Sequence, residues 1–389
     1  MPARTVCALR RTLWALSLAM LVELAGCAAQ PPAAPIPRAA STSSISGPTG
    51  AEGAARGEPA GGGAATAPAS PAVPPEPTLV RMGVLGVLAD LPVYLADQRG
   101  YLREQGLTLQ TEQFRSGAEM FPALATGQLQ AGWTAPTAAL FNAYAADVDV
   151  PIVASYGRTD RDRNNVIFVV GGGSAVQDPR DLQGRTIAIN SRATISYLYA
   201  DRALRRAGLT LGDVAIEELP FPDMPPALAS GKIDAAQLID PFATMLILSG
   251  AARPLARGYD VAGEHDPGML QFAPDFARQR AVATRYLKAL LLAGRDYATG
   301  LVYGQEPLRQ EVLGVLRDQF RIQNDALLDQ LGFTGPNPNG RVSLNGLRES
   351  QDFFVAQGLV SRPVVIERMV DNSFVDAVLA DIGEYQPPR

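Results

Sequence analysis

The chain holds few residues that could carry out catalysis. Its 389 residues include two cysteines, Cys7 and Cys27, and a single histidine, His265, which stands in the loop-like segment 263–267. No nucleophile motif accompanies this histidine, no HExxH motif occurs, and the glycines at 171–173 are not followed by the lysine of a phosphate-binding loop. Because catalysis needs such groups, we expect no enzyme activity, no metal and no cofactor.

Residues suited to binding an anion fall where predicted strands end. Arg115 and Arg158 could each clamp a sulfonate, carboxylate or phosphate through paired N–H donors. Ser116, Ser191 and Thr194 stand at or near predicted helix starts, where free backbone N–H groups favour anions. Either arginine could instead be a solvated surface charge.

Aromatic and acidic residues at other strand ends would suit a flat heteroaromatic ring or an amine. Trp133 could instead pack in the core, and Asp90 and Asp240 could cap helices. The anionic and the ring or amine ligands are alternatives between which the sequence does not choose. The complete set of expected ligand-binding residues is Asp90, Tyr94, Arg115, Ser116, Trp133, Thr134, Tyr156, Arg158, Asn190, Ser191, Thr194, Phe221, Asp223 and Asp240.

Alternating strands and helices would bring these residues together. Ser116 and Glu119 have the spacing of a capping box, and Thr194 precedes a helix predicted over 195–207. From residue 275 onward, apolar residues recur at helical spacing. The alternation predicts an α/β fold with mostly parallel sheets, whose ligands bind at the carboxyl ends of strands. Strands are predicted over residues 79–85, 107–111, 186–189 and 215–219.

A short internal repeat suggests lobes of related design. Residues 123–131 (ALATGQLQA) are echoed by residues 227–235 (ALASGKIDA). Each copy predicts the end of a helix, a glycine at the position after its C-cap and then a short strand. A common helix–glycine–strand connection that occurs twice by chance is the alternative.

The N-terminus has the pattern of an export signal. Three arginines precede an apolar run over 13–22, which is shorter than the roughly 20 apolar residues of a stable membrane span. The tetrad Leu-Ala-Gly-Cys at 24–27 resembles the bacterial lipobox, which implies diacylation of Cys27 and cleavage before it. An ordinary signal peptide with a chance cysteine is the alternative. We therefore expect residues 1–26 to be a lipoprotein signal peptide.

The segment after Cys27 predicts a spacer. Residues 28–78 are almost entirely Ala, Pro, Gly, Ser and Thr, without a periodic apolar face that could offset the entropy of ordering. We expect residues 27–78 to be the lipidated cysteine and a disordered linker. About 310 residues then remain, enough for two lobes with separate cores. The net charge of −5 argues against nucleic acid as a partner.

Several stretches after residue 78 together resemble a known family. They are residues 92–96, 100–107, 123–127, 181–185, 227–241 and 351–374. In order and spacing they resemble the substrate-binding proteins of bacterial ABC importers for nitrate, sulfonates, taurine and thiamine-precursor pyrimidines. The resemblance implies a two-lobed, type II-like periplasmic binding protein fold with hinge crossing strands and C-terminal helices. Lobe I would comprise residues 79–164 and 256–389, and lobe II residues 165–255.

The resemblance also implies a function. The chain would be an extracytoplasmic solute-binding lipoprotein, a monomer that captures a small organic or oxyanionic ligand and delivers it to an ABC transporter permease. Cys27 would hold it at a membrane, in the periplasm or on the outer face of the cell membrane. A ligand sensor for a signalling partner is the alternative. An enzyme of pyrimidine or menaquinone synthesis shares the fold, but the chain lacks the Cys-rich segment on which the pyrimidine-forming enzymes depend.

Overall fold

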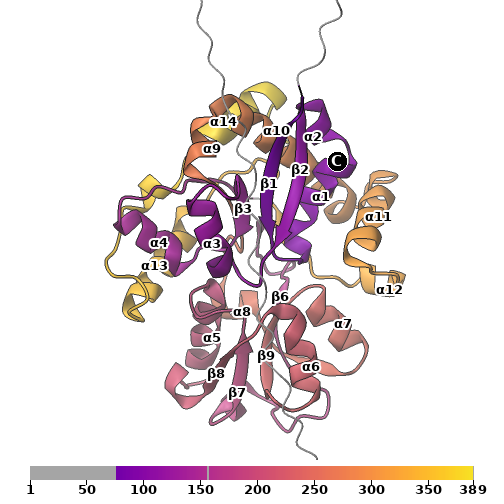
Figure 1. The fold of residues 1–389 in the computed structure, drawn as a ribbon. Coiled ribbons are helices and arrows are strands. Elements are labelled where there is room, and N and C mark those ends of the chain that lie inside the picture. The colour runs from indigo at the N-terminus through magenta and orange to yellow at the C-terminus, as the bar shows by residue number, and fades with distance from the viewer. Residues whose placement is uncertain (1–75, 156, 389) are drawn as a thin grey trace, which may run out of the picture. The chain divides into compact units, whose positions relative to one another are not determined.

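The computed structural model describes residues 76–155 and 157–388. The expected signal peptide, Cys27 and nearly all of the expected linker lie outside these residues. Within them, one sheet with its helices forms a first lobe, and another sheet with its helices forms a second lobe (Figure 1). None of the helices in the described part of the chain is long and apolar enough to cross a membrane.

The first sheet has the strand order β2-β1-β3-β11-β4. Its strands are β1 (Thr78–Val84), β2 (Leu107–Gln113), β3 (Ala131–Thr134), β4 (Ile152–Ala154) and β11 (Met269–Phe272). The connections between β1 and β4 contain α1 (Leu91–Gln98), α2 (Tyr101–Glu104), α3 (Gly117–Ala125) and α4 (Ala138–Ala145). β1 is parallel to β2 and β3, whereas β11 is antiparallel to β3 and β4.

The second sheet has the order β10-β6-β9-β7-β8. Its strands are β6 (Val166–Gly171), β7 (Thr186–Ile189), β8 (Ala215–Glu218), β9 (Ala235–Ile239) and β10 (Ala252–Arg257). Its helices are α5 (Ile195–Arg206), α6 (Met224–Ala229), α7 (Phe242–Leu248) and α8 (Gly258–Ala262). β6 is antiparallel to both β9 and β10.

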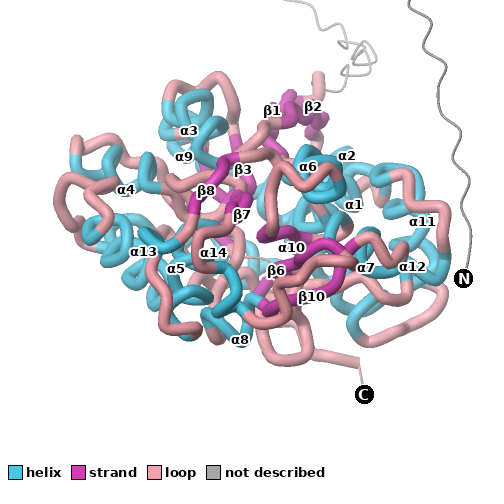
Figure 2. The backbone as a smooth tube through the Cα atoms, turned by 90° about the horizontal axis from the view of Figure 1, so that it is seen from below, coloured by secondary structure: helices cyan, strands magenta, loops and turns pink. Residues whose placement is uncertain are grey.

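The C-terminal part is helical and belongs to the first lobe, where α10 packs on α1 and α14. Its helices are α9 (Pro274–Arg278), α10 (Arg280–Tyr297), α11 (Leu308–Phe320), α12 (Asp325–Leu328), α13 (Leu344–Ala356) and α14 (Ser373–Ile382). α13 also lies beside α5 of the second lobe (Figure 2). A small ladder joins β5 (Gly157–Arg158) to β12 (Gly335–Pro336).

The expectation of mostly parallel sheets is confirmed, with one exception in each sheet. A single described strand of each sheet runs against its neighbours, β11 in the first and β6 in the second. Each is the first strand after the chain has passed from one lobe to the other. Parallel neighbours require a crossover connection within their own sheet, and a strand that arrives from the other lobe has none.

Local expectations about the ends of helices are confirmed. The hydroxyl of Ser116 accepts a hydrogen bond from the backbone N–H of Glu119, and that of Thr194 accepts one from the N–H of Ser196. Both copies of the repeat end a helix, α3 or α6, with a left-handed glycine and then enter β3 or β9. These glycines are Gly127 at φ +75° and Gly231 at φ +72°.

The second lobe extends past its expected end. β10 continues to Arg257, and α8 packs on α5 and β6 with Val261 in the lobe's core. Apolar side chains cover both faces of this sheet. The larger core of the first lobe includes the C-terminal helices, so the side chains around the cavity described next are held by packed elements on each side.

Candidate functional site

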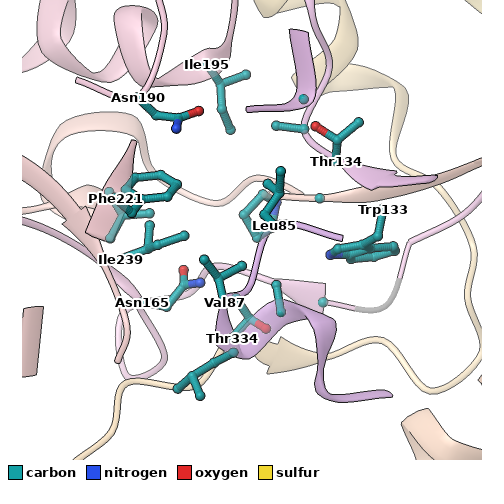
Figure 3. A pocket seen from close by; sticks show the side chains of 18 of the residues that line it. Leu85, Val87, Trp133, Thr134, Asn165, Asn190, Ile195, Phe221, Ile239 and Thr334 are labelled. Atoms are coloured by element: carbon teal, nitrogen blue, oxygen red, sulfur yellow. The ribbon is translucent and has the colours of Figure 1, made fainter. Parts of the chain in front are cut away.

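A cavity lies between the ends of the two sheets (Figure 3). The empty space within its walls is about 990 Å³ when the open solvent at its mouth is counted. The first lobe contributes Leu85, Val87, Trp133, Thr134, Gly268, Tyr297 and Phe333, and the second contributes Val166, Asn190, Thr194, Ile195, Phe221, Gln237 and Ile239, with Asn165 at the crossing. Most of this surface is aliphatic or aromatic.

The loop between β1 and α1 forms part of the wall, and Asp90 holds it from behind. Its Oδ2 accepts hydrogen bonds from the backbone N–H groups of Leu85 (3.1 Å) and Val87 (3.0 Å). Asp90 is fully buried, and this burial raises its pKa to about 7 despite the N–H donors that favour the charged form. Asp90 therefore shapes the cavity wall but is not one of its lining residues.

The end of β3 places Trp133 and Thr134 against backbone that lacks side chains. A Cβ on Gly268 would lie 2.9 Å from the indole of Trp133, and a Cβ on Gly117 would lie 1.7 Å from Oγ1 of Thr134. Glycine is required at both positions by this close approach. Trp133 is 4% exposed, so its ring is fixed in the wall before any ligand arrives.

Asn190, at the end of β7, connects the lobes. Its Nδ2 donates to the backbone carbonyl of Arg115 in the first lobe at 2.8 Å. Beside it, the backbone N–H of Ala138 donates to the carbonyl of Ala193 at 2.9 Å. These bonds join the wall around the N-terminus of α5 to the first lobe.

Two carboxamides of the lining are buried without a complete set of partners. Asn165 is 5% exposed and Gln237 is 1% exposed, and neither Oδ1 of Asn165 nor Oε1 of Gln237 has a hydrogen-bond partner in the described chain. Leaving such an oxygen unpaired costs roughly 1–3 kcal/mol. Figure 3 shows the Asn165 carboxamide near Val87 and Ile239.

The expected arginine clamps do not line the cavity. Arg115 lies at its rim, 3.8 Å from the carboxylate of Asp223, and both side chains are more than half exposed. Arg158 pairs with Asp266 at 3.4 Å. Arg115, Ser116 and Ser191 line a separate shallow groove that shares Asn190 with the cavity.

Tyr94 and Asp240 also lie outside the lining. The Tyr94 ring packs edge-on against Phe320 at 6.0 Å between centroids. Asp240 is buried, which raises its pKa to about 6. Its carboxylate accepts the N–H and the hydroxyl of Thr244 and the N–H of Gly332, and so anchors the lining segment 332–334. Tyr156 falls outside the described residues.

The structure thus brings together Trp133, Thr134, Asn190, Thr194 and Phe221 from the expected set. Sequence reasoning missed Asn165, Gln237, Gly268 and the segment 332–334. Gln237 left a usable signal, since it is a lone polar residue in the apolar strand Ala235–Ile239. Segment 332–334 left none, because only the tertiary fold carries it to the cavity.

The single histidine lies behind the cavity wall. Nε2 of His265 is hydrogen bonded to the hydroxyl of Tyr199, whose ring lines the cavity, and Nδ1 to the carbonyl of Gly263 at 2.9 Å. Burial lowers the pKa of His265. Among the described residues, no group of three or more His, Cys, Asp or Glu side chains could hold a metal ion.

Comparison with known sequences confirms the family resemblance. Residues 90–249 match the family described as NMT1/THI5 like. A protein of Escherichia coli (strain K12) named for the binding of aliphatic sulfonates is 30% identical over 38% of this chain. One of Brachyspira hyodysenteriae (strain ATCC 49526 / WA1), named as an ABC transporter periplasmic binding protein, is 27% identical over 43%. The matches span 45% and 50% of those relatives.

Comparison with solved structures confirms the two-lobed binding-protein fold. The alkanesulfonate-binding protein of Xanthomonas axonopodis pv. citri is similar at a TM-score of 0.64 and 23% identity, over 76% of this chain and 99% of that one. The desulfurization enzyme DSZB is similar at a TM-score of 0.58 and 19% identity, over 78% of this chain and 99% of that one. Similar folds therefore serve mostly binding proteins and also an enzyme.

Proposed function

We propose that this chain is an extracytoplasmic solute-binding lipoprotein that captures a small organic or oxyanionic ligand and delivers it to an ABC importer. The observation that carries the proposal is the mostly apolar cavity lined from both lobes. The ABC-type names of the relatives support a permease as partner. We assign no catalytic role to the site, because His265 lies behind the wall with both ring nitrogens hydrogen bonded, to Tyr199 and to Gly263.

The ligand contacts that we propose are Trp133, Thr134, Asn190, Thr194 and Phe221. Asp90 and Asp240 act indirectly, through the wall segments that they hold. A ligand that touches both lobes stabilises the closed arrangement over an open one, and the closed form is what a permease can distinguish. The Asn190–Arg115 and Ala138–Ala193 bonds are among the contacts that opening would break.

The membrane anchor in this proposal is Cys27. Its test is Cys27→Ala in the source cell, followed by fractionation and labelling with a radioactive fatty acid. We expect the label to be lost and the protein to leave the membrane fraction. A labelled Cys27→Ala variant would contradict the anchor and leave the solute-binding proposal untouched.

A thermal-shift screen tests the solute-binding proposal. The panel comprises sulfonates, nitrate, carboxylates, pyrimidines, flavins and polyamines, against wild type and Ala135→Trp. Ala135 lines the cavity and is half-buried, so the added indole fills ligand space. A ligand at 100 times its Kd stabilises by about 2.7 kcal/mol. We expect such a shift with wild type alone, and equal shifts in both proteins would contradict binding in the cavity.

A further inference from the structure

The charge of the cavity wall points to a particular class of ligand. None of the described residues that line the cavity is Asp, Glu, Lys, Arg or His. An ion that moves from water into such a site loses its hydration and gains no counter-ion, which is unfavourable. An uncharged molecule meets no such obstacle.

The charged groups nearest to the wall are already engaged. The Arg115 guanidinium faces the Asp223 carboxylate at the rim, and Arg158 faces Asp266. Asp90 and Asp240, which adjoin lining residues in sequence, are acids and would repel an anion. No arginine or lysine is among the described residues that line the cavity.

At two helix N-termini of the wall, two N–H groups of each first turn are bonded within the protein. The first turn of α5 is closed by Thr194, whose hydroxyl accepts from Ser196 and whose carbonyl accepts from Tyr197. The start of α3 is closed in the same way, with Glu119 and Met120 donating to Ser116. These N–H groups are satisfied within the protein.

Two carboxamide side chains, Asn165 and Gln237, are among the polar residues of the wall, and their oxygens are shielded from solvent without a partner in the described chain. The aromatic faces of Trp133, Phe221 and Phe333 suit a flat apolar body beside these carboxamides.

We propose that the cavity binds an uncharged, mostly apolar and flat organic molecule whose polar group is held by the carboxamide of Gln237 or Asn165, in preference to a sulfonate or another anion. This inference rests on the proposed function and names its ligand class. It differs from what the sulfonate-binding names of the similar proteins would suggest. The reason for the difference is that none of the described lining residues carries a charge.

A pair of dyes that differ only in charge tests the inference. N-phenylnaphthylamine is uncharged and has one N–H donor, and anilinonaphthalenesulfonate adds a sulfonate to the same skeleton. Both are titrated into the full chain carrying Trp14→Phe, so that Trp133 is the remaining tryptophan and its quenching reports occupation of the cavity. We expect the uncharged dye to bind at least about tenfold more tightly.

Matched leucine variants test whether the Gln237 carboxamide binds the polar group of the ligand. Gln237→Leu should weaken the uncharged dye roughly two- to tenfold, the range of one net hydrogen bond. Gln271→Leu is the control, because Gln271 is as buried as Gln237, also has an unpaired side-chain oxygen and lies outside the lining. Replacing an unpaired buried amide by an apolar side chain spares the fold, and Asn165→Ala tests the second carboxamide in the same way.

Each of the other outcomes contradicts one part of the proposal. If the sulfonate dye quenches Trp133 at equal or lower concentration, the charge inference fails and the cavity of the proposed function stands. If neither dye quenches Trp133, the proposed ligand class fails, and the thermal-shift panel with Ala135→Trp decides the proposed function separately. If Gln237→Leu, Asn165→Ala and Gln271→Leu all bind the uncharged dye with the same affinity, the role assigned to the carboxamides of Gln237 and Asn165 is wrong.

Discussion

Asn190 donates from its side chain to the backbone carbonyl of Arg115 at 2.8 Å, across 75 residues of sequence and between the two lobes. The bond stands at the edge of the cavity, since Asn190 is a lining residue. It therefore couples the ligand wall to closure of the lobes.

Asn190→Ala should weaken ligand binding about two- to tenfold, because the closed form loses a hydrogen bond worth about 0.5–1.5 kcal/mol. Calorimetric titration measures the change. The matched control is Asn142→Ala, because Asn142 donates to the carbonyl of Leu359 at the same 2.8 Å but within the first lobe. Equal affinity losses in the two variants would show that the bond has no special part in closure.

Trp133→Phe should reduce affinity about three- to tenfold, because it removes aromatic surface from the wall. It should also lower stability by about 1–3 kcal/mol, since Trp133 is buried in the core of the first lobe. The control is Phe272→Leu, a substitution in the same core away from the cavity, which should lower stability alone. Unchanged affinity in Trp133→Phe would remove this residue from the site.

Arg115→Ala should change affinity less than about threefold at any ionic strength, because its guanidinium is exposed and already faces Asp223. Titrations at low and high salt measure this. Lys232→Ala, which breaks the comparably exposed pair with Glu217 far from the cavity lining, is the control. A loss above about thirtyfold that salt enhances would restore Arg115 as an anion clamp.

Asp90 should make the protein less stable as the pH rises. Its pKa is about 7 in the folded chain against 3.8 for an unperturbed carboxyl, so the folded state holds the extra proton between those values. The unfolding free energy of Asp90→Asn relative to wild type should increase from pH 4 to pH 8, by at most about 4 kcal/mol. Urea titrations across this range measure it.

The control for Asp90 is Asp181→Asn. Backbone N–H groups of Gln177 and Asp178 lower the pKa of Asp181, so its charged form stabilises the fold. This variant should be less stable than wild type at neutral pH and approach it in acid. A flat difference for Asp90→Asn would mean that its carboxyl titrates normally.

Local patterns predicted the elements of this chain better than the composition of its site. The caps at Ser116 and Thr194 and the glycines at 127 and 231 follow from side-chain and backbone chemistry within a few residues. The reversed strands β6 and β11 could not be predicted in this way, because their direction depends on where the chain crosses between lobes.

The residues of the site likewise divide into those that local patterns predicted and those that depend on distant parts of the chain. Strand ends correctly placed Trp133 and Asn190 at the cavity, whereas Arg115 and Asp90 stand equally close to strand ends and do not line it. Which way a side chain turns depends on partners distant in sequence, such as Asp223 for Arg115. Gly268 and Thr334 reach the cavity only through the return of the C-terminal segments.

Native mass spectrometry after incubation with a culture extract measures whether the cavity between the lobes holds a solute. Wild type is compared with Ala135→Trp, which adds an indole inside the cavity, and with Ala146→Trp, which adds the same ring at an exposed site. We expect wild type and Ala146→Trp to retain one or a few small molecules that are absent from Ala135→Trp. The same set of adducts on all three proteins, or none on any, would contradict this expectation.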